Sequence, residues 1–252
     1  MAQGKGAGRS GHVRLTARHA ALCAGVLALL APGPASAQAF QCRTPPAPVS
    51  VPRVAPDGPT RNVAIAGYTL ALSWSPEYCR GRERTATDQF QCSGRSGRFG
   101  FVLHGLWPEG RGGAWPQWCP ATHQLSPREL ARNLCMTPSA KLLATEWAKH
   151  GACMVRRPEA YFAQARTLWD ALRWPDFDRL SRRERLTAGD LRQAFASANP
   201  RWPAGGIALV VNRRGWLEEI RLCYDRAFQP TRCANRRLGP ADTTRVKIWR
   251  GL

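Results

Sequence analysis

Nine cysteines in a chain of 252 residues constrain the fold more than any other feature, because eight of them fall between positions 42 and 233. The ninth, Cys23, lies in an apolar run, residues 20–31, which four basic residues and no acidic residue precede. Ala35-Ser36-Ala37 follows the run. This order is typical of a secretory signal peptide, and the run is too short to span a bilayer. We predict that residues 1–37 are removed, so that an exported chain begins at Gln38.

The cysteines that remain are an even number in a chain predicted to be exported, which predicts four disulfides. They are Cys42, Cys79, Cys92, Cys119, Cys135, Cys153, Cys223 and Cys233. About 105 pairings of eight cysteines are possible, so the count leaves the connectivity open. The sequence has no Cys-x-x-Cys pair, which argues against a zinc site or a thioredoxin-like centre. We expect a disulfide-stabilised fold with no metal and no cofactor.

The exported chain is predicted to consist of a short tail and one domain. Residues 43–61 contain six prolines and few large apolar residues, which predicts an extended or mobile segment. The residues that follow suffice for one domain with a sizeable core. We assign residues 1–37 to the signal peptide, 38–61 to a Pro-rich tail and 62–252 to a single domain.

Hydrophobic periodicity predicts the secondary structure of that domain. Strands are predicted at 68–74, 98–103, 206–211 and 216–224, and helices at 138–150, 158–173 and 187–198. The first strand has the alternation of a half-buried strand, the second ends just before His104, and Thr137 is the expected N-cap of the first helix. Strands, then helices, then strands predict an α+β fold with a central antiparallel sheet packed against several helices.

The net charge is strongly positive. The signal peptide holds four of the 37 basic residues and none of the 17 acidic ones, so its removal lowers the formal charge only from +20 to +16. Such a charge suits a polyanionic partner. Nearly all the basic residues are arginine, however, which genome base composition alone can produce. The charge permits nucleic-acid binding and indicates nothing more specific.

Two short segments, residues 104–108 and 146–153, carry the candidate chemistry. Residues four apart share a helix face, so Glu146 and His150 point the same way with Lys149 beside them. RNA brings its own nucleophile, the 2′-hydroxyl, so cleavage needs a base, an acid and positive charge near the phosphorus. Histidine has an ordinary pKa of about 6.5 and suits both proton transfers. His104 and the three residues of the second segment are therefore candidates for metal-free RNA cleavage.

Each of these residues also has a plainer interpretation. A single histidine near a strand end is more often a hydrogen-bonded structural residue, and a Glu–His pair four apart on a helix is often a surface pair. Glu146 and His150 could form half of a metal site, but a further histidine in that spacing is missing. On composition alone, Trp107 is more readily a core residue than an aromatic surface on which a nucleobase stacks. Taken together, the residues of the two segments fit these interpretations poorly.

The two segments resemble the paired signature segments of the ribonuclease T2 family, secreted acid ribonucleases that include plant self-incompatibility enzymes. His-Gly-Leu-Trp-Pro begins at His104, and Glu-Trp-x-Lys-His-Gly-x-Cys begins at Glu146. Residues 73–76 with Cys79, and residues 219–223, resemble the first strand region and a late strand of the family. The resemblance covers roughly residues 68–233, and the Pro-rich tail lies outside it.

By motif position, the resemblance implies that His150 is the general base and His104 the general acid. It implies that Glu146 and Lys149 stabilise the transition state and that Trp107 contacts a base. Many members have a third histidine directly before the glutamate. Thr145 stands there in this chain, so one phosphate contact differs, and we retain Thr145 as a substrate-binding candidate.

The resemblance also implies three of the disulfides. These are Cys119–Cys153, Cys79–Cys92 and Cys223–Cys233, which leaves Cys42 and Cys135 for the fourth. A Cys119–Cys153 bridge would hold the two signature segments near each other.

Together these observations predict an exported, metal-independent endoribonuclease that cleaves single-stranded RNA to a 2′,3′-cyclic phosphate and then to a 3′-phosphate. We expect a monomer in the periplasm or the medium, without membrane attachment once the signal peptide is removed. Two alternatives stay open. One is an exported RNA-binding or toxin-like protein on the same fold with little turnover, and the other is a metallohydrolase that uses Glu146 and His150.

Overall fold

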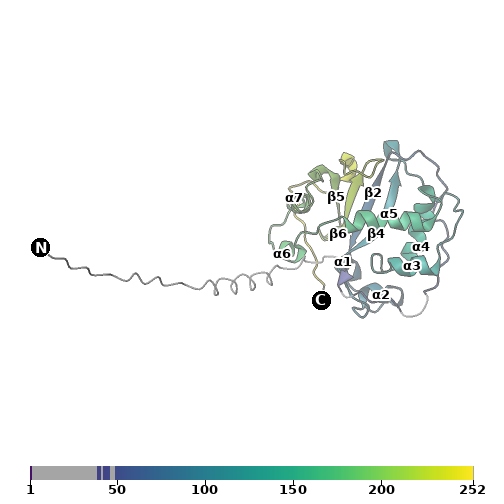
Figure 1. Ribbon diagram of the computed structural model, residues 1–252, viewed down its shortest axis with the longest axis horizontal. Coiled ribbons are helices and arrows are strands. Elements are labelled where there is room, and N and C mark those ends of the chain that lie inside the picture. The colour runs from purple at the N-terminus through teal and green to yellow at the C-terminus, as the bar shows by residue number, and fades with distance from the viewer. Residues whose placement is uncertain (2–38, 41, 46–48, 252) are drawn as a thin grey trace. The chain divides into compact units, whose positions relative to one another are not determined.

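A four-stranded antiparallel sheet with the order β4-β2-β6-β5 forms the centre of the fold (Figure 1). The computed structural model describes residues 1, 39–40, 42–45 and 49–251. The predicted signal peptide therefore lies outside the described residues, except for Met1. Helices α4 and α5 contact β4, and α7 contacts β5. The predicted α+β class, with an antiparallel sheet packed against helices, is confirmed.

The elements have the following bounds. The strands are β1 (Ala39–Phe40), β2 (Gly67–Trp74), β3 (Arg98–Phe99), β4 (Phe101–Glu109), β5 (Ile207–Val211) and β6 (Leu217–Tyr224), and β1 pairs with β3 outside the main sheet. The helices are α1 (Ser75–Cys79), α2 (Gln89–Cys92), α3 (Pro127–Asn133), α4 (Ala140–Lys149), α5 (Pro158–Asp170), α6 (Phe177–Ser181) and α7 (Ala188–Ala198). In the described part of the chain, none of these helices has both the length and the apolar composition needed to cross a membrane.

The two strands that were predicted before the first helix both differ from expectation. Strand β2 lies between β4 and β6, so Leu70, Ala71 and Leu72 are all fully buried and the strand is not half-buried. The second predicted strand breaks at Gly100 and then continues as β4 to Glu109. His104 therefore lies within a strand and not at its end, because pairing with β2 extends β4 past the predicted boundary.

A side chain caps the start of α3, α4, α6 and α7, but the cap of α4 is not the residue expected. Helix α4 begins after Ser139, whose hydroxyl accepts a hydrogen bond from the Leu142 amide at 3.2 Å. Thr137 is not the cap, because its hydroxyl instead donates to the Leu103 carbonyl of β4 at 2.7 Å. The start of α4 is thus fixed against β4, the strand that carries His104.

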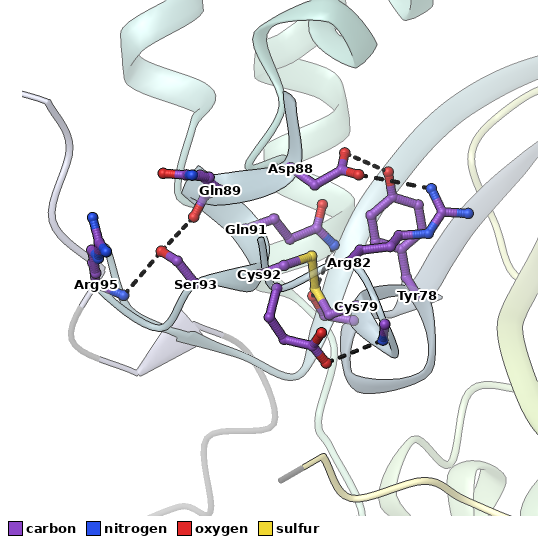
Figure 2. Close-up of a disulfide and its surroundings, with 12 residues drawn as sticks. Tyr78, Cys79, Arg82, Asp88, Gln89, Gln91, Cys92, Ser93 and Arg95 are labelled. Carbon is purple, nitrogen blue, oxygen red and sulfur yellow. Dashed lines mark hydrogen bonds and ion pairs between the residues drawn. A yellow bond between two sulfur atoms is a disulfide. The ribbon is translucent and has the colours of Figure 1, made fainter. Parts of the chain in front are cut away.

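All four disulfides are present: the three that the family resemblance implied, and the pair that was left over. They are Cys42–Cys135, Cys79–Cys92, Cys119–Cys153 and Cys223–Cys233. Figure 2 shows how Cys79–Cys92 joins α1 to α2, with Tyr78 donating to Asp88 beside it at 3.0 Å. Cys119–Cys153 ties the loop after the first signature segment to the end of the second.

The described part of the Pro-rich segment is extended and packs against the body. Residues 49–60 contain no helix or strand, and Val49, Val51 and Val54 pack against the main hydrophobic core. Arg61 then pairs with Gln117 through two backbone hydrogen bonds of 2.9 and 3.0 Å. The boundary between a tail at 38–61 and a domain at 62–252 stays a prediction.

Candidate active site

His104 lies at a β-bulge in β4. Gly105 pairs with Ala71 of β2 and Leu103 pairs with Leu72, which leaves His104 as the extra residue without a partner. A bulge turns a side chain out of the regular alternation and is common beside active sites. The His104 side chain is consequently one-third exposed in a stretch of β4 whose neighbours are buried.

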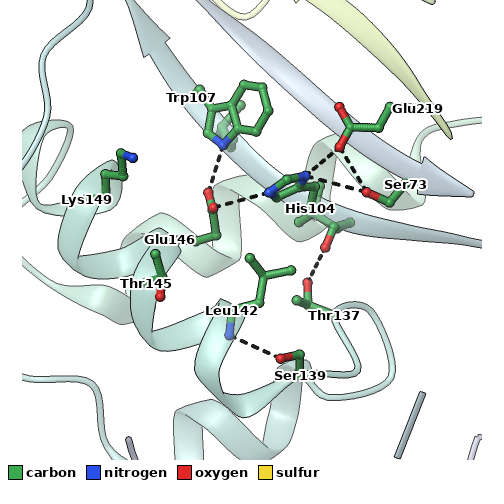
Figure 3. A network of polar contacts seen from close by, with 12 residues as sticks. Ser73, His104, Trp107, Thr137, Ser139, Leu142, Thr145, Glu146, Lys149 and Glu219 are labelled. Atoms are coloured by element: carbon green, nitrogen blue, oxygen red, sulfur yellow. Dashed lines mark hydrogen bonds and ion pairs between the residues drawn. The ribbon is translucent and has the colours of Figure 1, made fainter. Parts of the chain in front are cut away.

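Glu219 of β6 contacts the Nδ1 side of the His104 ring, as Figure 3 shows. Nδ1 lies 2.6 Å from Glu219 Oε1, and because an ionised carboxylate only accepts, Nδ1 carries the proton. Ser73 donates to the same oxygen at 3.1 Å, and Arg221 donates to Oε2 at 2.8 Å. These contacts direct Nε2 of His104 towards Glu146.

The charges around this pair set its protonation. Burial alone would lower the pKa of His104, but the hydrogen bond to Glu219 and the charges of Glu146 and Glu219 raise it above the ordinary value. Burial would raise the pKa of Glu219, but the hydrogen bond from His104 and the charges of His104 and Arg221 lower it to about 2. His104 therefore keeps its proton to higher pH than an ordinary histidine, beside an ionised carboxylate.

Glu146 is buried in α4 and faces His104 from the opposite side to Glu219. Its Oε1 is 3.8 Å from His104 Nε2, too far for a hydrogen bond, and its Oε2 accepts from Trp107 Nε1 at 2.8 Å. Burial raises the pKa of Glu146 to about 7, against the lowering effects of His104, Trp107 and Lys149. A Cβ on Gly105 would lie 1.9 Å from Glu146 Oε2. The first signature segment therefore has glycine at that position so that the carboxyl group fits.

His150 follows the last residue of α4, and its backbone N–H donates to the Glu146 carbonyl at 3.1 Å. Burial, with the charges of Lys149 and His104, lowers the pKa of His150 to about 3. Its Nδ1 is buried and has no hydrogen-bond partner among the described residues. His150 is thus neutral at ordinary pH, whereas the pKa of His104 is shifted the opposite way, towards the charged form.

Lys149 contacts a residue from the Pro-rich segment. Its Nζ is 2.7 Å from Asp57 Oδ2, and Asp57 Oδ1 accepts from Trp118 Nε1 at 2.9 Å. Lys149 Nζ also lies 5.7 Å from the centroid of the Trp118 ring. The hydrogen bonds from Lys149 and Trp118 lower the pKa of Asp57, so Asp57 is an anion.

All the predicted site residues meet in one cleft of about 980 Å³, a size ordinary for a ligand site. His104, Trp107, Thr145, Glu146, Lys149 and His150 all line it. A second cleft of about 1270 Å³ shares His104, Thr145 and Arg221 with the first. His104 therefore lies where two clefts meet.

Trp107 and Thr145 occupy different positions in the cleft. Trp107 is partly exposed and not a core residue, with the guanidinium of Arg221 5.0 Å from its ring centroid and the His104 ring edge-on at 5.1 Å. Thr145 lies one position before Glu146, but its hydroxyl donates back to the Lys141 carbonyl at 2.9 Å. Trp107 thus offers an aromatic surface, while the Thr145 hydroxyl is engaged within α4.

Sequence reasoning did not identify Glu219, Arg221 and Asp57 as site residues. Glu219 and Arg221 lie two apart in β6, so they project from one face, and two opposite charges at this spacing in a predicted strand are a signal that could have been used. Asp57 carried no such signal, because its partners are about 60 and 90 positions away. Within the described residues, no three His, Cys, Asp or Glu side chains meet in a way that could hold a metal.

Comparison with known proteins gives a family match that covers most of the part of the chain that the structure describes. The model of the Ribonuclease T2 family matches residues 66–233. A probable ribonuclease of Haemophilus influenzae is 32% identical over 190 residues, which cover 71% of this chain and 65% of that protein. A ribonuclease of Aeromonas hydrophila is 33% identical over 168 residues, which cover 63% of this chain and 71% of that one. This chain thus spans less than two thirds of the first relative's length.

Solved structures share the fold at lower identity. An RNase-related protein from Calystegia sepium superposes with a TM-score of 0.57 at 22% identity, over 73% of this chain and 97% of that chain. RNase NT, solved in complex with 5′-AMP, superposes with a TM-score of 0.53 at 21% identity, over 73% of this chain and 98% of that chain.

Proposed function

The chain belongs to the ribonuclease T2 family, and on that premise we propose that it is an exported endoribonuclease that cleaves single-stranded RNA without a metal ion. The observation that carries the proposal is the pair of histidines in one cleft whose pKa values are shifted in opposite directions. A neutral histidine can accept a proton, and a charged one can donate it. General acid–base catalysis of phosphodiester cleavage needs both at once.

His150 is the general base in this proposal, and His104 is the general acid. His150 removes the proton of the 2′-hydroxyl, whose oxygen attacks the adjacent phosphorus, and the P–O5′ bond breaks. His104 donates its Nε2 proton to the departing 5′-oxygen. The products are a 2′,3′-cyclic phosphate and a 5′-hydroxyl. In the second step water takes the place of the 5′-oxygen, the two histidines exchange roles, and a 3′-phosphate results.

The low pKa of His150, about 3 in the free protein, suits this role once substrate is present. Part of that lowering comes from the positive charges of Lys149 and His104. A bound phosphate diester is an anion and offsets both charges, so substrate raises the proton affinity of His150. The base is therefore unprotonated when it is needed and becomes stronger when substrate binds.

Glu146 and Lys149 stabilise the transition state in this proposal. Lys149 supplies a cation for the non-bridging oxygens as negative charge accumulates. Glu146, with a pKa of about 7, carries a proton for part of the time at neutral pH and for most of it in mild acid, and a protonated carboxyl group can donate to the same oxygens. Trp107 Nε1 holds that carboxyl group in place.

The two clefts that meet at His104 support a polynucleotide substrate, because chain on both sides of the scissile phosphate would have a place to lie. The Trp107 ring, with Arg221 against it, offers a stacking surface for a base, a mode of binding that tolerates many sequences. The 5′-AMP held by RNase NT, which shares the fold, supports nucleotide binding by a site of this kind. A double helix does not present its bases for such stacking, so single-stranded RNA is the proposed substrate.

The location in the periplasm or the medium and the monomeric state are part of the proposal. The four disulfides support an oxidising compartment, since such bridges are rare where glutathione and thioredoxin keep thiols reduced.

The test is cleavage of a short single-stranded RNA in EDTA, with identification of the new end groups. Wild type is compared with His150→Ala and with His123→Ala, a matched control because His123 is exposed and lines neither cleft. We expect cyclic-phosphate ends with wild type and the control, and none with His150→Ala. Binding without cleavage by wild type would favour the RNA-binding protein. Cleavage that requires added metal would favour the metallohydrolase.

A further inference from the structure

A carboxylate from outside the family-matched region contacts the lysine of the candidate site. Asp57 lies nine residues before the match begins at residue 66, yet its Oδ2 is 2.7 Å from Lys149 Nζ. Asp57 also accepts a hydrogen bond from Trp118 Nε1, so both of its oxygens are used. The segment that carries it is therefore part of the site, although the family resemblance does not include it.

The segment is held in place by several contacts with one loop. Gln117 Nε2 donates to the Pro59 carbonyl at 2.8 Å, and the Thr60 hydroxyl donates to the Trp118 carbonyl at 3.1 Å. Two backbone hydrogen bonds join Arg61 to Gln117, and the backbone N–H of Trp118 donates to the carbonyl of Lys149 at 2.9 Å. These hydrogen bonds fix the segment, so the fold sets the position of Asp57 beside Lys149.

The contact with Asp57 weakens the electric field of the Lys149 ammonium group. A carboxylate in direct contact with an ammonium group cancels most of its field at the distance of an arriving phosphate. The ammonium group must also leave Asp57, or share its protons with Asp57, before it can bind a phosphate oxygen fully. Because the Asp57 side chain is 62% exposed, the ion pair is weak and a phosphate can displace it.

We propose that Asp57 competes with the substrate phosphate for Lys149 and thereby lowers the affinity of this site for polyanions. The inference rests on the proposed function and names a residue that sets substrate affinity within it. Asp57 acts through Lys149 and is a positioning residue, not a catalytic one. Its expected effect is on binding and KM more than on kcat, because the competition takes place before the chemical step.

The experiment uses Asp57→Asn, since asparagine keeps the shape and can still accept from Trp118. The matched control is Asp178→Asn, which removes the same charge from an exposed aspartate paired with Arg182 and lining neither cleft. The probe is a fluorescent single-stranded DNA oligonucleotide, which lacks the 2′-hydroxyl and stays intact. At low salt we expect Asp57→Asn to bind it about three- to tenfold more tightly, and Asp178→Asn by less than about 1.5-fold. Equal binding by the two variants would overturn the proposal.

A second comparison separates competition from simple repulsion of the probe. Lys149→Ala is made in the wild-type and the Asp57→Asn backgrounds. If Asp57 masks Lys149, the loss of the lysine costs about threefold more affinity in the Asp57→Asn background, where the lysine is free. If Asp57 only repels the probe, Lys149→Ala costs the same affinity in both backgrounds, and the inference is wrong.

Kinetics with an RNA substrate complete the test. We expect the KM of Asp57→Asn to fall about three- to tenfold while its kcat changes by less than about twofold. A fall in kcat with unchanged KM would overturn the inference. Because the DNA measurement needs no turnover, the proposed ribonuclease function and the proposed role of Asp57 can be refuted independently. Absent RNA cleavage by wild type refutes the ribonuclease, while unchanged DNA affinity of Asp57→Asn refutes the role of Asp57.

Discussion

Replacing Glu219 with glutamine tests the electrostatic basis of the acid–base assignment. Glutamine can still accept a hydrogen bond from His104 Nδ1, so the substitution removes the charge and keeps the contact. The bond at 2.6 Å is charge-assisted, and such bonds contribute about 1.5–3 kcal/mol, whereas a neutral one contributes about 1 kcal/mol. With the His104 side chain one-third exposed, a loss of about 1.4 kcal/mol is expected, which equals one pKa unit.

The sign of the effect follows from the role of His104. The contact with Glu219 raises the pKa of His104, so its removal lowers that pKa and the acid loses its proton at lower pH. The rate kcat/KM reports the free protein. The alkaline limb of its bell-shaped pH profile should therefore move down by about one pH unit. Above the limb, the rate should fall up to about tenfold.

The assay measures kcat/KM on a short single-stranded RNA from pH 4 to pH 9 for wild type, Glu219→Gln and Glu218→Gln. Glu218 is the matched control, because it is the adjacent and exposed residue of β6 and also lines the second cleft, whereas His104 is hydrogen-bonded to Glu219. An NMR titration of the His104 ring gives the same pKa independently. If the alkaline limb of Glu219→Gln stays within about 0.2 pH units of wild type, or moves equally in Glu218→Gln, the reasoning about Glu219 is refuted.

Two further predictions concern the framework of the site. Gly105→Ala places a Cβ against Glu146 Oε2, so we expect cleavage to fall at least about 100-fold while the melting temperature falls by only several degrees, and wild-type cleavage by this variant would contradict the steric argument. Replacing Cys119 and Cys153 together by alanine opens a loop of 34 residues, and chemical denaturation should show a loss of about 3–4 kcal/mol in the free energy of unfolding. A loss under about 1 kcal/mol would show that packing alone holds the two signature segments together.

Local pattern in the sequence was enough for the class of fold and for the core of the site. Helical spacing placed Glu146 and Lys149 in one helix, which ends one residue before His150 and not at it, and the two signature segments identified His104 as their partner. The structure brings these residues to one cleft, because helix periodicity and motif spacing are properties of contiguous residues, and their roles stay predictions. The strand that carries His104 was placed less well, because its length depends on pairing with β2, which lies about 30 positions earlier.

The properties that make the site chemically specific were decided by tertiary structure alone. The bulge at His104 is a matter of register between β4 and β2, and no local pattern encodes it. The opposite pKa shifts of His104 and His150 depend on burial and on charges from distant segments, with Glu219 115 positions from His104. Asp57 reaches Lys149 across 92 positions. The sequence by itself determined which groups could perform acid–base chemistry, but pKa values respond to all neighbours in space, so the opposite pKa shifts of the two histidines depend on the folded chain.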